Sequence, residues 1–234
     1  MLILSGIRSG NMVNGLEQTT AGVDATVAEL IQAIEAADSK GAMVVAVNNL
    51  AAAQDVAAIP TLITVLGYNN PGAAVAAING LAALGRAAVP ALLEQIDGYN
   101  YGARAWAIRA LALIGDPRAL PVLLETAKGD FALSVRRAAA RGLGTIHWAL
   151  LPPDQAATSQ STVLEVLTNA TADPEWVVRY AAVAGLQTLA TDLVEPEGQK
   201  PLILASLHRV FDQDETPAVQ ARARLAIDTL EATR

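Results

Sequence analysis

Apolar residues recur at helical spacing along most of the chain, and the pattern comes back at a nearly constant interval. Pro60, Pro90 and Pro121 each follow a small and an apolar residue and each precede an apolar run, and they lie 30 and 31 residues apart. A looser copy occupies residues 200–204. Proline is tolerated in the first turn of a helix, because its missing N–H would have no partner there. Each of these prolines therefore predicts the start of a helix.

A turn and a second helix are expected after each proline helix, with Gly85 and Gly115 stopping two of the second helices. Residues 1–22 are expected to form a flexible leader, and residues 23–234 a single domain with an insertion at about 149–159, where Pro152 and Pro153 interrupt the pattern. The predicted helix pairs lie at about 24–53, 56–85, 87–115, 117–148, 160–190 and 198–232.

A two-helix unit cannot bury its apolar face alone, so repeats of this length must stack on their neighbours. The sequence predicts an all-α fold, an α-solenoid of about six helix pairs in a right-handed superhelix without a sheet. Two repeats share the spacing Asp-x5-Arg-x-Ala-Ala, at Asp130 with Arg136 and at Asp173 with Arg179. This spacing resembles the aspartate and arginine that link neighbouring HEAT repeats in a ladder, so we assign these four residues to structure.

Composition narrows the possible functions. The chain is 53% hydrophobic but only 4% aromatic, and its formal net charge of −7 argues against nucleic acid as the main partner. The absence of cysteine excludes disulfides and a thiolate nucleophile within the chain, and the two histidines predict no metal site. Since no run of 18 apolar residues lacks a charge or a helix breaker, we expect no membrane span.

The densest group of chemically useful side chains lies at 97–109. Asp97, Tyr99, Tyr101, Trp106 and Arg109 fall within this short segment of a chain that has only nine aromatic residues. Aromatic rings beside arginines suit a flat, charged ligand. The structural alternative is that the tyrosines close a turn between repeats and that Trp106 fills a gap in the core.

Two further residues extend this candidate site. Tyr68 lies in the corresponding turn one repeat earlier, and Arg141 lies one repeat after Arg109 when the second helices are aligned. Adjacent helices pack about 8–10 Å apart, so Arg109 and Arg141 are expected to stand side by side. Two forked cations at that separation suit a ligand with two carboxylates. The alternative is a solvated face with local ion pairs.

Three segments, 67–75, 99–111 and 130–139, closely resemble the E/F-type heterodimeric phycobilin lyases of cyanobacteria. The resemblance covers about residues 24–190 and is strongest to the smaller, beta subunit of phycocyanobilin lyase. It implies an enzyme subunit that acts with a larger homologous subunit in a heterodimer. The implied activity attaches phycocyanobilin, as substrate, to a cysteine of the phycocyanin alpha subunit through a thioether bond. No cofactor, metal or nucleic acid is implied, and a cytoplasmic location is expected.

Under this resemblance, Arg109 and Arg141 would bind the two propionates of the bilin. Its pyrrole face would stack on Tyr99, Tyr101 or Trp106, and Tyr68 is a further candidate for ligand binding. Asp97 or Tyr99 is the preferred candidate for the catalytic proton donor, with His147 as a further candidate. The alternative function is a non-enzymatic HEAT-repeat adaptor or chaperone for phycobiliproteins.

Overall fold

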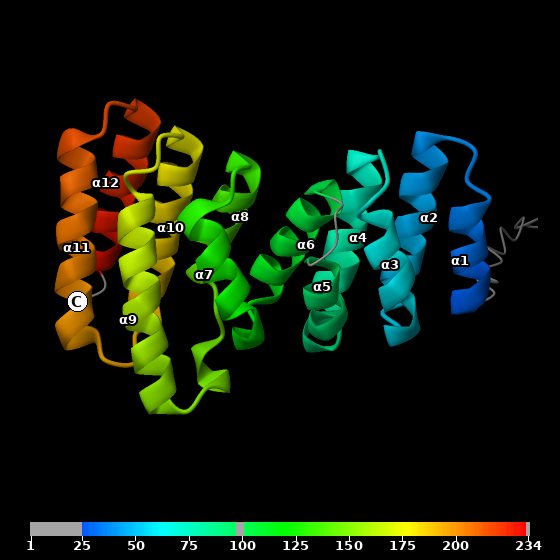
Figure 1. The fold of residues 1–234 in the computed structure, drawn as a ribbon, viewed down its shortest axis with the longest axis horizontal. Helices are drawn as coiled ribbons and strands as arrows, with labels where there is room; N and C mark the ends of the chain where they lie inside the picture. The colour runs from blue at the N-terminus through cyan, green and yellow to red at the C-terminus, as the bar shows by residue number, and fades with distance from the viewer. Residues whose placement is uncertain (1–24, 97–100, 233–234) are drawn as a thin grey trace, which may run out of the picture.

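The computed structural model describes residues 25–96 and 101–232, without the side chain of Tyr101, and all regular structure in these ranges is helical (Figure 1). Helices follow one another in pairs from α1 at one end to α11 and α12 at the other. The first helices of the pairs are α1 Val27–Glu35, α3 Ile59–Val65, α5 Val89–Ile96, α7 Leu120–Gly129, α9 Pro153–Ala170 and α11 Pro196–Gln213. The second helices are α2 Lys40–Ala52, α4 Pro71–Leu84, α6 Tyr101–Ile114, α8 Leu133–Leu143, α10 Trp176–Thr191 and α12 Pro217–Ala232. The predicted α-solenoid of about six pairs is confirmed.

Proline positions set the starts of the first helices. Pro60 and Pro121 lie in the first turn of α3 and α7, and Pro90 is the second residue of α5, as predicted. The sequence predicts that the last pair begins at about residue 198, and α11 begins slightly earlier, at Pro196, so that Pro201 of the looser repeat copy lies inside the helix. The first position of a helix needs no N–H donor, so Pro196 is the better start.

The fifth pair also begins earlier than predicted. Helix α9 starts at Pro153, and Asp154 lies in its first turn, where a negative charge favours the helix N-terminus. Part of the predicted insertion therefore forms the first turns of a long first helix. A short 3₁₀ turn, Trp148–Leu150, connects α8 to it and buries Trp148.

The two predicted glycine stops are both observed. Gly85 and Gly115 have φ values of +59° and +66°, in the left-handed region where glycine is unstrained. At Gly115 there is a second requirement, because an added Cβ would collide with the carbonyl oxygen of Thr145. The carbonyl of Gly115 also accepts a hydrogen bond of 2.8 Å from the amide of His147, which ties two consecutive repeats together.

The second helices pack more closely against one another than the first helices do. Small residues permit this approach: a Cβ on Gly80 would lie 2.6 Å from the Cβ of Ala51, and a Cβ on Gly185 would lie 2.6 Å from the carbonyl oxygen of Ala140. The more tightly packed layer lies on the inner side of a curved array. We call the exposed surface of α2, α4, α6, α8, α10 and α12 the inner face.

The core runs along the array between the two layers of helices. One leucine in each of five successive second helices is completely buried, namely Leu50, Leu81, Leu111, Leu143 and Leu186. Among the described residues, no single helix is both long and apolar enough to cross a membrane; the segments Pro71–Ala87 and Val89–Ile96 pass such a test only as a pair bent by 118°.

Candidate ligand-binding face

Along one edge of the array, arginines form hydrogen bonds and ion pairs that join neighbouring repeats. The Nε of Arg136 donates to the carboxylate of Asp173 at 2.7 Å, and its Nη1 donates to the backbone carbonyl of Asp130 at 2.8 Å. Arg179 repeats the arrangement with the carboxylate of Asp214 at 2.7 Å. Each arginine therefore joins the backbone of its own repeat to the carboxylate of the next repeat, and the predicted ladder between repeats is confirmed.

The ladder extends further than the sequence pattern indicated. Arg104 pairs with Asp130 at 2.8 Å, which adds a rung that sequence reasoning missed. Arg104 occupies the position one repeat before Arg136, so aligning the second helices could have found it. In the last repeat Gln220 takes the arginine position and donates to the carbonyl of Asp214 at 2.7 Å.

Two aspartates of the ladder, Asp173 and Asp214, are held in their charged form. Burial alone would raise the pKa of Asp173, but hydrogen bonds from Arg136 and from the amide of Glu175, together with the nearby positive charges, outweigh burial and lower this pKa below its ordinary value. The pKa of Asp214 is lowered in the same way, because hydrogen bonds from Arg179 and Thr216 and the charge of Arg179 together outweigh burial. These groups therefore stabilise the stacking of the repeats and have no free proton to deliver near neutral pH.

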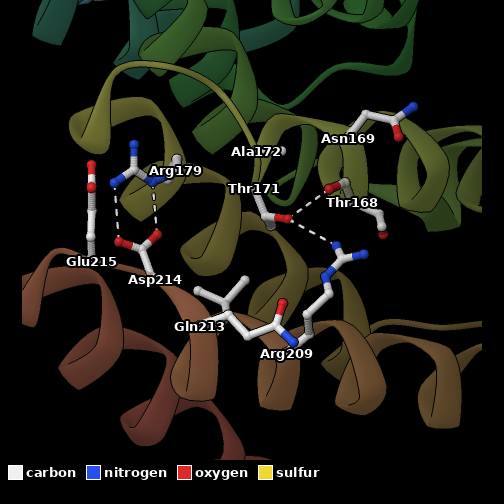
Figure 2. Close-up of a pocket in the computed structure, with 10 residues that line it drawn as sticks. Thr168, Asn169, Thr171, Ala172, Arg179, Arg209, Gln213, Asp214 and Glu215 are labelled. Atoms are coloured by element: carbon white, nitrogen blue, oxygen red, sulfur yellow. Dashed lines mark hydrogen bonds and ion pairs between the residues drawn. The ribbon is translucent and has the colours of Figure 1, made fainter.

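A polar cavity of about 410 Å³ opens on this edge, between the turns of the fifth and sixth pairs (Figure 2). Its two arginines already have partners: Arg179 forms the rung to Asp214, and Arg209 donates to the hydroxyl of Thr171 at 3.3 Å. Two acidic side chains, Asp214 and Glu215, also line it. The cavity therefore has little capacity left for an anionic ligand.

The inner face differs, because it also carries arginines, Arg109, Arg141 and Arg222, that form no ion pair with a carboxylate of the residues that the structure describes. Arg109 on α6 and Arg141 on α8 are both exposed and lie on neighbouring helices, as the sequence predicted. The guanidinium carbon of Arg109 lies 5.6 Å from the ring centroid of Trp106, a cation–π distance. Trp106 is partly buried and packs against the core, which holds its ring in place.

Of the remaining predicted site residues, the structure describes Tyr68 and His147. Tyr68 lies in the turn between α3 and α4 with 40% of its surface exposed. Asp97, Tyr99 and the side chain of Tyr101 lie outside the described residues. His147 is exposed at the end of the fourth pair.

Sequence reasoning missed the continuation of the inner face onto α10 and α12. Trp176 and Tyr180 on α10 are 46% and 40% exposed, and the guanidinium carbon of Arg222 on α12 lies 6.0 Å from the ring centroid of Tyr180. The spacing of four residues between Trp176 and Tyr180 places both rings on the same side of a helix. That spacing was visible in the sequence, but which face of the array it occupies was not.

Exposed apolar side chains complete this surface. Leu113 on α6 and Leu225 on α12 are 56% and 59% exposed. Aromatic rings, aliphatic side chains and arginines without counter-ions together suit a flat conjugated molecule that carries carboxylates. Within the described ranges, no group of three or more His, Asp or Glu side chains could hold a metal ion.

The stacked helix pairs and the arginine–aspartate ladder define a HEAT-repeat protein, and the sequence profile of HEAT repeats matches residues 69–144 and 89–187. Phycocyanobilin lyase subunit beta of Nostoc sp. is 52% identical over 198 residues, covering 85% of this chain and 97% of its own. Phycocyanin alpha phycocyanobilin lyase CpcF of Synechocystis sp. is 57% identical over 161 residues, covering 69% and 75%. The chain belongs to the family of phycocyanobilin lyase beta subunits, and the resemblance noted in the sequence is confirmed.

A solved structure of the complex of CpcE and CpcF of phycocyanin lyase from Nostoc sp. is also similar. Its matching chain is 53% identical with a TM-score of 0.68, and the match covers 74% of this chain and 99% of that one. Another relative, a phycobilisome maturation protein of Synechococcus elongatus, is 54% identical over 205 residues, covering 87% of this chain and 98% of its own.

Proposed function

We propose that this chain is the beta-type subunit of a heterodimeric phycobilin lyase, which attaches phycocyanobilin to a cysteine of the phycocyanin alpha subunit. The observation that carries the proposal is the inner face, which combines partly exposed aromatic rings with arginines that no described carboxylate neutralises. Family membership supplies the reaction, and the inner face supplies a surface on which its substrate fits.

The bilin is an open-chain tetrapyrrole with a conjugated, flat body and two propionates. The indole of Trp106, backed by the core, offers a stacking surface for a pyrrole ring. Arg109 and Arg141 on neighbouring helices are candidates for the propionates, because forked guanidinium groups bind carboxylates in a defined orientation. Holding both the body and the charged side chains fixes one conformation of an otherwise flexible ligand.

The reaction adds the thiol of the acceptor across an exocyclic double bond of the bilin. The sulfur forms a bond to carbon, and a proton is added to the neighbouring ring carbon, so no electrons are exchanged with a third reagent. The nucleophile comes from the acceptor protein, since this chain contains no cysteine. The contribution of this chain is to orient the bilin, and orientation alone supplies a large part of the acceleration of such a reaction.

Delivery of the proton to one face of the double bond sets the stereochemistry. Asp97 and Tyr99 remain our candidates for the proton donor, in the segment between α5 and α6 that precedes Trp106 and Arg109 in the chain. The ladder aspartates are poor candidates, because hydrogen bonds from arginine keep the pKa of Asp173 and of Asp214 low.

The test is co-expression with a larger partner subunit, a phycocyanin alpha subunit and the enzymes that make phycocyanobilin. We expect covalently attached pigment, detected by zinc-enhanced fluorescence on a denaturing gel, only when both lyase subunits are present. Pigment yield unchanged by omission of this chain would refute the proposal. Stabilisation of the acceptor without pigment attachment would favour an adaptor or chaperone instead.

A further inference from the structure

Arg222 is a cation that the fold leaves partly unsatisfied. It lies on α12 with its side chain half-buried, and its Nη1 atom is buried without any hydrogen-bond acceptor among the described residues. Burying one nitrogen of a guanidinium group without an acceptor costs stability, because the lost hydration is not replaced. An arginine kept for structure would instead be paired, as Arg179 is at the edge of the adjacent helix.

The neighbours of Arg222 increase the imbalance. The ring of Tyr180 on α10 lies against its guanidinium group, 6.0 Å from centroid to carbon. Burial lowers the pKa of Arg222, Tyr180 acts in the opposite direction, and the positive charge of Arg141 on α8 adds the smallest, lowering effect. No carboxylate of the described residues forms an ion pair with Arg222.

We infer that Arg222 forms a carboxylate-binding site floored by Tyr180, and that this site receives one propionate of the bilin. A carboxylate placed there would supply the acceptor that the guanidinium group of Arg222 lacks among the described residues. The pyrrole ring that carries the propionate would lie over Tyr180 and Trp176, which are exposed on the same helix.

This inference rests on the proposed function and changes where on the inner face a propionate of the bilin would bind. Arg109 stacks on Trp106, so its guanidinium group is already positioned over a ring, whereas Arg222 lacks an acceptor. One propionate would therefore bind at α10 and α12, two and three repeats beyond Arg109 on α6.

The test measures affinity of the heterodimer for phycocyanobilin by absorbance titration, with Arg222→Gln and Arg224→Gln compared. Arg224 is the matched control, because it is on the same helix but is exposed and pairs with Asp228 at 2.9 Å. We expect Arg222→Gln to weaken binding about tenfold or more and Arg224→Gln to leave it within about twofold. The dimethyl ester of the bilin should bind more weakly to the wild-type heterodimer, and Arg222→Gln should add no further loss for the ester.

Three outcomes would overturn the inference in distinguishable ways. Wild-type affinity of Arg222→Gln for the free acid would remove this site and leave the proposed function intact. Weaker binding of the phycocyanin alpha subunit, with unchanged binding of bilin, would assign Arg222 to a carboxylate of the acceptor protein. Failure of the wild-type heterodimer to bind bilin would remove both the site and the function. A thermal melt of Arg222→Gln at or above the wild-type temperature excludes misfolding as the cause of lost affinity.

Discussion

The ladder edge and the inner face use the same side chain, arginine, in opposite ways. At the ladder edge Arg136 and Arg179 are largely buried and each bonds a carboxylate of the next repeat at 2.7 Å. On the inner face Arg109 and Arg141 are exposed, and Arg222 is half-buried with one nitrogen unsatisfied. Residue type alone therefore does not separate structural arginines from candidate ligand-binding arginines in this fold, whereas the presence or absence of a protein counter-ion does.

The largest loss of stability is expected when an arginine of the ladder is removed. Arg179→Ala should lower the free energy of unfolding by about 3–5 kcal/mol, because it leaves the buried carboxylate of Asp214 without its partner. Chemical denaturation followed by circular dichroism measures the change. Arg224→Ala is the control: its pair with Asp228 has a similar length but is more than half exposed, so the loss should stay below about 1 kcal/mol. Equal losses in the two variants would contradict the structural role of the ladder.

Acid should weaken the ladder edge before it affects the inner face. The pKa of Asp214 is lower in the folded chain than its ordinary value of 3.8. The rung therefore contributes fully above about pH 4, and its contribution is lost as the pH falls through the lower, folded pKa. Unfolding free energies measured between pH 6 and pH 2.5 should fall more steeply for the wild type than for Arg179→Met. Parallel curves would mean that the pKa of Asp214 is the same in the folded and the unfolded chain.

A smaller loss is expected at the end of the ladder. Gln220→Ala removes the hydrogen bond of 2.7 Å to the carbonyl of Asp214 and should lower the free energy of unfolding by about 1 kcal/mol. Gln220→Glu places a negative charge, which cannot donate, against the same carbonyl and should be worse than alanine. If glutamate and alanine gave the same stability, the hydrogen bond would have no measurable role.

The smallest effect on stability is expected on the inner face. Arg109→Ala and Arg141→Ala should each change the free energy of unfolding by less than about 0.5 kcal/mol, since both side chains are exposed and have no ion pair within the described ranges. Both should nevertheless weaken binding of phycocyanobilin to the heterodimer, measured by the same absorbance titration. A marked fall in stability would place these arginines in the structural class with Arg136 and Arg179.

Much of the fold could be predicted from the sequence because its signals are local. Proline and glycine at fixed intervals fix where helices begin and end, and the Asp-x5-Arg spacing of Asp173 and Arg179 places both residues at one turn. The same locality explains why two helix starts lie earlier than predicted: either Pro196 or Pro201 satisfies the pattern of a helix start, and Pro153 can either break a helix or begin one.

The candidate site was only partly predictable, because it depends on contacts between helices. The contact of Trp106 with Arg109 follows from a spacing of three residues on one helix. The environment of Arg222 does not, because the ring of Tyr180 comes from a helix that lies one repeat earlier in the chain. That Nη1 of Arg222 lacks an acceptor is a property of the assembled array and leaves no mark in the local sequence.

The neutral side chain of Gln220 also bears on self-association. Each ladder rung is a head-to-tail contact, in which an arginine of one repeat meets an aspartate of the next. Contacts of this kind do not close on themselves, so a free rung at the end of the array would allow copies of the chain to add one after another into a filament. Gln220 bonds its own turn and carries no charge for an incoming carboxylate. The repeat that holds Gln220 therefore offers no arginine at this position for a head-to-tail rung to another copy.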